Sequence, residues 1–333
     1  MPKNQDTGPV MPDKRIPTAA TGYYVAASLA LAVLVVFAGL PNSTRFLHVL
    51  HKTGHPLAFG AMALMALAVF RARPAAGAAQ WWQPYLGALA VAIVVGALTE
   101  VAQQFTHRGS SLTDVVNDAL GATACLAIHA AVCGDGARRP VWQTRGLALV
   151  GSLAAIAALA PLATCIAAYA WRDARFPGIT QAGNRLDLYF ISQDSHNVER
   201  SPLPSRWAQT PGEMALRVAI DVGEYPAMHM TEPYPQWTGY GSLALDLTNP
   251  GKDELELVVR VHDRLHNYRY DDRFNRPVRI PAEARLTVTL PLQEVAKGPR
   301  HRALDLQSVA DISVFAARPV ANGVFFVSRI WLQ

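Results

Sequence analysis

Residues 100–121 place acidic side chains between two long apolar runs. Glu100 and Gln103 are three positions apart and share one helix face, and Asp114 and Asp118 repeat this pattern at i, i+4 on the next run. An ionised side chain at membrane depth costs roughly 2.5 to more than 10 kcal/mol, so such groups are kept where they pair or do chemistry. The segment predicts a membrane-embedded protein whose polar residues gather where two spans meet.

Lys52 and His55, one helical turn apart ahead of an earlier apolar run, join this polar cluster. Its members are Lys52, His55, Glu100, Gln103, Arg108, Asp114 and Asp118. One role is structural: ion pairs, with Ser111 and Asp114 as a capping box. The other role is a pocket for a polar headgroup or substrate. As an enzyme site it would use Glu100 or Asp114 as general acid or base, with His55 as partner. No metal-ligand spacing is present, and no cofactor is expected.

The chain divides into two parts of different composition. It has 333 residues, of which 51% are hydrophobic and only 17% are charged, with a net charge of +5. The positive excess lies before residue 172, where eleven Lys and Arg face six Asp and Glu, against nineteen of each afterwards. A hydrophobic bundle followed by a polar domain explains this division. The basic residues flank apolar runs and are not interleaved with aromatics, so no nucleic-acid partner is expected.

Five apolar runs are long enough to cross about 30 Å of hydrocarbon. They cover residues 22–40, 56–71, 85–104, 114–133 and 147–171. The flanks on the N-terminal side of the membrane carry eight Lys or Arg and those on the other side five, so the N-terminus is expected in the cytoplasm. We therefore expect a cytoplasmic tail at 1–21, a five-span domain at 22–171, and the remainder outside the cytoplasm. This describes a multi-pass protein of the inner (cytoplasmic) membrane, with the lipid bilayer as a partner.

The second part of the chain follows the alternation of β-strands. Apolar and polar residues alternate at 255–262 and 286–290, and turn signals such as the one at 249–251 separate such segments. Seven or eight short strands predict an antiparallel sandwich or jelly roll at 205–333. A linker and lead-in at 172–204, with a strand candidate at residues 186–191, is expected before it.

Residues 262–276 form the densest mixture of polar and aromatic side chains in the chain. Aromatic faces beside planar hydrogen-bonding groups suit sugar rings. The alternative is a loop held by its own Asp–Arg pairs, and the carboxylates in it could also supply oxygens to a structural calcium ion. The glycan-binding candidates are Trp237, Tyr240, Asp263, His266, Tyr268, Tyr270, Asp272, Arg273 and Asn275.

Two family resemblances follow from these motifs. H-K-x-x-H before the second span, followed by E-x-x-Q-x-F…R…S-x-x-D-x-x-x-D-x-x-G, resembles the VanZ-like membrane protein family over residues 20–135. The matching residues are Lys52, His55, Glu100, Gln103, Arg108, Asp114 and Gly121. Asp118 stands where that family usually has Asn, and His51 where an Asp often precedes the Lys. The resemblance implies a bacterial envelope protein linked to glycopeptide-antibiotic resistance.

The second resemblance covers residues 205–333. W-x-G-Y…L-x-L-D-L-x-N-P…V-x-D-R-x-H-N-Y-x-Y-D-D-R-F-N…G-P-R-x-R-x-L-D-L is similar to galactose-binding-like, carbohydrate-binding-module-like jelly rolls. It implies a glycan-binding fold, with an envelope polysaccharide or glycolipid as partner.

We expect a membrane protein, not demonstrably an enzyme, that presents this domain outside the cytoplasm to engage envelope glycans or glycolipid headgroups. The alternative is a membrane-embedded enzyme acting on a lipid-linked saccharide. A transporter is disfavoured, because the sequence has no inverted repeat and no matching pair of Gly- or Pro-broken spans.

Overall fold

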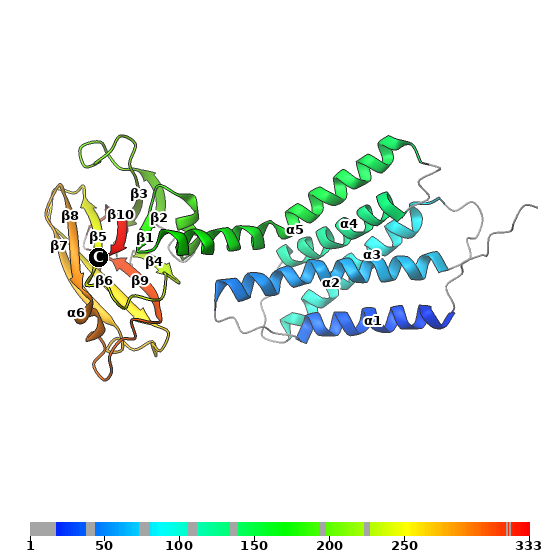
Figure 1. The fold of residues 1–333 in the computed structure, drawn as a ribbon, viewed down its shortest axis with the longest axis horizontal. Helices are drawn as coiled ribbons and strands as arrows, with labels where there is room; N and C mark the ends of the chain where they lie inside the picture. Colours follow the sequence, from blue (N-terminus) through cyan, green and yellow to red (C-terminus); the bar gives the residue numbers. More distant parts are fainter. Residues whose placement is uncertain are drawn as a thin grey trace, which may run out of the picture. The chain divides into compact units, whose positions relative to one another are not determined.

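The chain forms two compact units, Met1–Thr164 and Cys165–Gln333, in a computed structural model (Figure 1). The structure describes residues 18–37, 44–72, 80–105, 112–133, 139–192, 198–222, 227–317, 319 and 321–333. The boundary between the two units falls inside a helix, Val141–Arg175.

The first unit is helical. Its helices are α1 (Thr18–Phe37), α2 (Arg45–Ala72), α3 (Gln83–Gln104), α4 (Leu112–Cys133) and α5 (Val141–Arg175). Helices α2 to α5 are each long and apolar enough to cross a membrane, and α1 contributes a shorter apolar stretch, Thr21–Leu34. Four of the five expected spans therefore have the length and composition to cross a membrane, and the fifth span stays a prediction. The end of α5, from residue 165 onward, belongs to the second unit.

Small residues bring α2 and α4 into close contact. A Cβ placed on Gly121 would lie 2.0 Å from the carbonyl oxygen of Pro56, and one on Gly60 would lie 2.6 Å from Sγ of Cys125. Helices in lipid associate largely through such close backbone approach, because lipid tails compete with any purely apolar attraction between them. The contact holds α2 against α4 at the level of the polar cluster.

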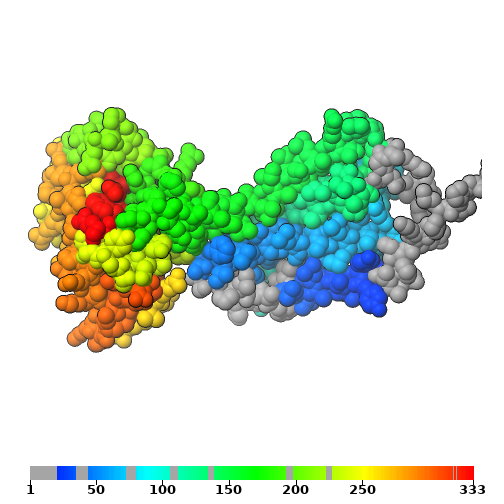
Figure 2. Space-filling view, in the orientation of Figure 1, coloured from blue at the N-terminus to red at the C-terminus, as the bar shows by residue number. Residues whose placement is uncertain are grey.

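The second unit contains two antiparallel sheets. The six-stranded sheet has the order β2-β3-β10-β5-β8, with β1 paired to β10, and the four-stranded sheet has the order β4-β9-β6-β7. The first comprises β1 (Gly178–Gln181), β2 (Val198–Pro202), β3 (Met214–Ile220), β5 (Ser242–Asn249), β8 (Ala284–Pro291) and β10 (Gly323–Leu332). The second comprises β4 (Ala227–Thr231), β6 (Leu255–Asp263), β7 (Phe274–Ile280) and β9 (Val309–Phe315). In Figure 2 the red atoms near the end of β10 lie at the surface of this unit.

One hydrophobic core joins the two sheets. Leu243, Leu245 and Leu247 of β5 are fully buried, as are Leu257 and Val259 of β6, and all belong to the same packed cluster. Each such side chain contributes about 1.5–3 kcal/mol through burial. Successive strand residues point to opposite faces, so the residues between these apolar positions are carried on the outer face of each sheet.

The predicted antiparallel sandwich is confirmed, but its lead-in is not a linker. Within the expected linker at 172–204, β1 pairs with β10 and β2 with β3, so the sandwich begins well before residue 205. The strand expected at 186–191 is instead a short 3-10 helix, Arg185–Phe190. Asn184 caps the start of this helix, because its side-chain oxygen accepts a hydrogen bond from the N–H of Leu186 at 2.8 Å.

Glycine substitutions test the contact between α2 and α4. Gly121→Ala should lower the thermal unfolding temperature in detergent, because overpacking against a backbone carbonyl typically costs about 1–3 kcal/mol. The matched control is Gly146→Ala on α5, where an added Cβ meets nothing within 4 Å. That change should leave stability unchanged or raise it, through the better helix propensity of Ala. Equal effects of the two changes would contradict the close contact.

Candidate functional site

An open groove of about 710 Å³ lies on the outer face of the four-stranded sheet. It is lined by Ala227, His229, Val258, Arg260, Tyr270, Arg273, Phe315 and Ala317. These residues come from β4, β6 and β9, from the residues following β9, and from the segment before β7. We refer to this feature as the groove.

A polar row crosses all four strands of this sheet. His229 of β4 lies opposite Ser313 of β9, Ser313 lies opposite Arg260 of β6, and Arg260 lies opposite Asn275 of β7. Neighbouring strands are about 4.8 Å apart, so the row extends over about 14 Å. That length exceeds a single sugar ring and suits an extended chain.

An apolar row lies beside the polar one, two residues away along each strand. Phe315 of β9 stands between Ala227 of β4 and Val258 of β6. Tyr270 adds a second aromatic ring at the groove, and its side chain is 71% exposed. Aromatic and apolar surface beside a row of hydrogen-bonding groups matches the two faces of a sugar, which are C–H and hydroxyl.

A hydrogen-bond network centred on Asp311 links side chains of the polar row. Nδ1 of His229 lies 2.8 Å from Oγ of Ser313, which donates to Oδ1 of Asp311 at 2.6 Å. The same carboxylate oxygen accepts from Arg260 at 3.3 Å. These bonds fix the side chains in place before any ligand arrives.

Three buried polar atoms at or beside the groove have no hydrogen-bond partner among the described residues. They are Nε of Arg260, Nε of Arg273 and Oδ1 of Asn275. An unpaired buried polar atom costs about 1–3 kcal/mol. A ligand with hydroxyl groups could donate to the amide oxygen and accept from the guanidinium nitrogens, so these atoms make the groove a candidate binding surface.

His262 extends the outer face of β6 beyond Arg260. Its ring stacks on that of His266, with 4.4 Å between ring centroids. Burial lowers the pKa of His262, and the charges of His266 and Arg260 act in the same direction, against the attraction of Asp311. His262 is therefore a neutral ring at neutral pH.

Arg302 clamps the loop that carries Tyr270 and Arg273. Its guanidinium binds both carboxylate oxygens of Asp263, at 2.5 and 2.8 Å, and both of Asp272, at 2.6 and 3.1 Å. The bond to Arg302, together with the N–H of Asn267, lowers the pKa of Asp272 to about 2. For Asp263, burial opposes the shift, but Arg302 and the N–H of Asp305 hold the pKa below its usual range.

This clamp argues against calcium at the same carboxylates. Asp263 and Asp272 share one guanidinium, so a positive group already occupies the space between the two carboxylates where a cation would have to bind. Across the described parts of the chain, no group of three or more His, Cys, Asp or Glu side chains is arranged to hold a metal ion.

The structure corrects several glycan-binding candidates. Trp237 is 0% exposed, belongs to the core and donates its indole N–H to the carbonyl of Tyr234 at 2.7 Å, so it cannot stack on a sugar. Tyr240 packs on Phe176 with 5.2 Å between ring centroids and does not line the groove. Both rings serve the core, which neither the residue type nor the spacing reveals.

The remaining candidates come from the 262–276 segment. Asp263 and Asp272 are structural partners of Arg302. His266 lies under the loop, where Nδ1 contacts the carbonyl of Asp272 at 2.9 Å. Tyr268 is 93% exposed and does not line the groove. Three candidates are brought to the groove face: Tyr270, Arg273 and Asn275.

Sequence reasoning missed His229, Arg260, Ser313 and Phe315. The signal for Arg260 was present, because residues 255–262 alternate and Arg260 falls on the polar side. The other three come from strands far apart in sequence, and only the pairing of β4, β9 and β6 brings them into neighbouring rows.

In the helical unit, the polar cluster forms two pairs. Nζ of Lys52 lies 3.6 Å from Oδ1 of Asp114, and Nδ1 of His55 lies 3.7 Å from Oδ1 of Asp118. Asp118 is 0% exposed, and a Cβ placed on Gly96 of α3 would lie 3.4 Å from its Oδ2. For His55 and Asp118 this arrangement favours structural pairing of buried groups over an open pocket. The Lys52 side chain of the other pair is 42% exposed.

Other members of the cluster lie on α3 or outside the described residues. Glu100 and Gln103 are buried on α3, each 5% exposed. The charges of Asp118, Asp114 and Glu100 all act on His55, so these groups lie near one another. Arg108 and Ser111 lie outside the described residues, so their expected roles stay predictions.

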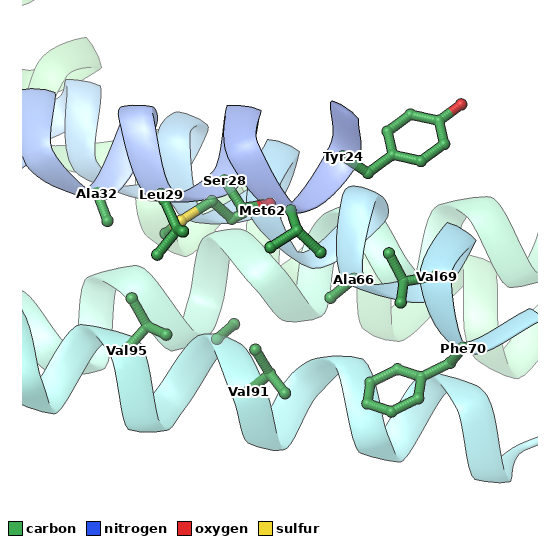
Figure 3. Close-up of a pocket in the computed structure, with 12 residues that line it drawn as sticks. Tyr24, Ser28, Leu29, Ala32, Met62, Ala66, Val69, Phe70, Val91 and Val95 are labelled. Carbon is green, nitrogen blue, oxygen red and sulfur yellow. The ribbon is translucent and has the colours of Figure 1, made fainter. Parts of the chain in front are cut away.

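An apolar cavity of about 240 Å³ separates parts of α1, α2 and α3. Figure 3 shows Leu29 and Ala32 of α1, Met62 of α2 and Val91 and Val95 of α3 around it. Its lining is almost wholly hydrocarbon. The cavity therefore suits a lipid chain or helix packing; Tyr24 and Ser28 add hydroxyl groups to its lining, which contains no carboxylate and no histidine among the described residues.

No protein-family model and no curated protein matches the chain. Among solved structures, it is similar to a family 11 carbohydrate-binding module from Clostridium thermocellum in complex with a β-1,3-1,4-mixed-linked tetrasaccharide. The identity is 18%, the TM-score is 0.32, and the match covers 40% of this chain and 81% of the module.

Two further structures give similar values. An exo-β-agarase matches at 16% identity and a TM-score of 0.33, over 41% of this chain and only 22% of the agarase. A family 30 carbohydrate-binding module of a cellulosomal cellulase from Clostridium thermocellum matches at 12% identity and a TM-score of 0.31, over 43% of this chain and 86% of the module. Similarities this low say nothing about the ligand, so any assignment of a ligand has to rest on the geometry of the groove.

A double-mutant cycle tests the buried pair. His55→Leu and Asp118→Leu should each lower the unfolding temperature in detergent, because removing one partner of a buried charged pair costs about 3–5 kcal/mol. The double variant should be more stable than the sum of the two losses predicts, since neither charge is left alone. Strictly additive losses would contradict the pairing.

Acid titration tests the Arg302 clamp. The pKa of Asp272 is about 2 in the folded protein, against an ordinary 3.8, so its contribution to stability is present above the ordinary value and is lost as the pH falls from there to about 2. Arg302→Gln should lower the unfolding temperature by several degrees near neutral pH and flatten its fall over that acid range. The control is Arg279→Gln, which removes an exposed arginine 3.4 Å from Glu256 and should change neither. A clamp variant with the wild-type acid profile would refute the assignment.

Proposed function

We propose that this protein is a membrane-anchored glycan-binding protein. Its apolar helices hold the chain in the bilayer. The groove on the four-stranded sheet binds a stretch of envelope polysaccharide or the saccharide headgroup of a glycolipid. The proposal assigns recognition to the sandwich and anchoring to the bundle.

One observation carries the proposal: the polar row from His229 to Asn275 lies directly beside the apolar row centred on Phe315. A saccharide needs both kinds of surface, because its rings expose C–H faces and its edges expose hydroxyls. Nε of Arg260 and Oδ1 of Asn275 supply an unpaired donor and an unpaired acceptor at that edge. The length of the row supports a chain over a single sugar.

The proposal places the sandwich outside the cytoplasm. Its support is the distribution of Lys and Arg, with eight in the flanks on the N-terminal side and five on the other. Envelope glycans are then in the same compartment as the groove. The resemblance of residues 20–135 to the VanZ-like family, with its link to glycopeptide resistance, remains a prediction beside this one.

The alternative of a membrane-embedded enzyme receives less support. It would need Glu100 or Asp114 as acid or base, with His55 as partner. A catalytic group must touch substrate, yet Asp114 lies near Lys52 and His55 near the fully buried Asp118. Groups held in such pairs are better explained as the polar interior of a helical bundle.

Glycan capture by the full chain in nanodiscs tests the proposal. Peptidoglycan fragments and a panel of bacterial exopolysaccharides would be titrated by calorimetry and pull-down. Tyr270→Ala should weaken binding about tenfold, because it removes an aromatic face worth about 0.5–1.5 kcal/mol beyond its buried area. Phe315→Ala should do the same or more.

The matched control is Tyr268→Ala, two residues from Tyr270 on the same loop. Tyr268 is almost fully exposed and does not line the groove, so its removal should leave affinity within about twofold. Equal losses for Tyr268→Ala and Tyr270→Ala would place the binding surface elsewhere. If the wild-type chain binds no member of the panel, the proposed function is refuted.

A further inference from the structure

The groove carries more positive than negative charge. Its lining includes two arginines, Arg260 and Arg273, and no Asp or Glu among the described residues. Asp311, on the same face of the sheet, accepts hydrogen bonds from Arg260 and from Ser313. One carboxylate for two guanidinium groups leaves a net charge of about +1 beside the polar row.

Of the two arginines that line the groove, Arg273 is the one without an ion-pair partner among the described residues. Its Nε is buried without a hydrogen-bond partner, and its guanidinium lies 5.1 Å from the ring centroid of Tyr270. Burial lowers the pKa of Arg273, and the nearby charge of Arg260 lowers it further. A half-buried guanidinium without an acceptor is costly, whereas one that binds an anionic ligand is stabilised.

The position of Arg273 is imposed by the fold. It immediately precedes β7, two residues before Asn275 and so on the same face of the strand. Asn275 lies opposite Arg260, which makes Arg273 a diagonal neighbour of Arg260. The two arginines therefore flank one point of the groove, and Tyr270 adjoins it.

We propose that the groove selects acidic saccharides, and that the carboxylate of a uronic acid residue binds between Arg260 and Arg273. The sugar ring packs on the aromatic surface of Tyr270 and Phe315, and its hydroxyls meet Asn275 and His229. This inference rests on the proposed function and adds the substrate class. A planar guanidinium binds a carboxylate through two parallel hydrogen bonds, which gives geometric selection as well as charge.

A carboxylate suits the site better than a phosphate monoester. The groove offers about one net positive charge, which one carboxylate neutralises, whereas a phosphate monoester carries about −1.5 to −2 at neutral pH. The aromatic rings of Tyr270 and Phe315 also favour a ligand whose negative charge lies next to a sugar ring. A uronic acid residue has this arrangement, because its carboxylate is attached to a ring carbon.

The test compares two forms of one polymer on the full chain in zwitterionic nanodiscs. The probes are an oligogalacturonate of defined length and the same oligomer after carbodiimide–borohydride reduction, which converts each carboxylate to a hydroxymethyl group and keeps the ring stereochemistry. Binding would be measured by calorimetry at physiological salt. The acidic form should bind at least tenfold more tightly than the reduced form. Dextran sulfate serves as a polyanion without carboxylates and should bind weakly.

Arg273 is the residue to change, because its removal strands no carboxylate among the described residues. Arg273→Gln should remove the preference for the acidic oligomer, so that the acidic and the reduced oligomer bind the variant about equally. Arg273→Lys keeps the charge but loses the bidentate geometry and should retain part of the preference. Arg279→Gln, an exposed arginine of the same strand, should change nothing. Unfolding temperatures of all variants would establish that each is folded.

The outcomes separate this inference from the proposed function. Tight binding of the acidic oligomer that depends on Arg273 supports both. Equal binding of the acidic and reduced oligomers overturns the acidic preference and leaves glycan binding standing. Tight binding of dextran sulfate that survives Arg273→Gln overturns it as well, because general polyanion attraction would then explain the signal. A chain that binds neither oligomer, nor any member of the polysaccharide panel, fails both proposals.

Discussion

The binding surface depends on one guanidinium. Arg302 joins Asp263, at the end of β6, to Asp272, just before β7, and so closes the loop that connects these two strands. That loop carries Tyr270 and Arg273 to the edge of the groove. Without the bridge, two buried or half-buried carboxylates would repel each other at the base of the loop. The clamp is therefore the condition under which an aromatic ring and an unpaired arginine can be held beside a flat sheet.

The groove is also a product of the whole sandwich. Its sheet has the order β4-β9-β6-β7, so neighbours in space are distant in sequence, and each strand contributes outward side chains only because its alternate residues fill the core. Buried residues such as Val259 and Val314 fix which side of β6 and β9 faces out. A shift of one residue in either strand would turn Arg260 or Ser313 towards the hydrophobic core and destroy the polar row.

This dependence explains what the sequence could and could not predict. Apolar runs and alternating segments predict helices followed by an antiparallel sandwich. The 262–276 segment contains Tyr270 and Arg273, which line the groove. Burial is not visible in residue type, so Trp237 was interpreted as a ligand contact although it fills the core. His229 and Phe315 were missed because their position depends on long-range strand pairing. The VanZ-like motif locates the polar cluster but assigns it no chemistry.

Hydrogen–deuterium exchange with bound glycan tests the central claim most directly. The full chain in nanodiscs would be compared with and without a saturating oligosaccharide. The account predicts protection in peptides covering 227–231, 258–262, 270–275 and 311–315, which together form the groove face of the four-stranded sheet. Protection confined to 244–248 and 285–289, on the outer face of the other sheet, would contradict it, whatever the affinity of the ligand.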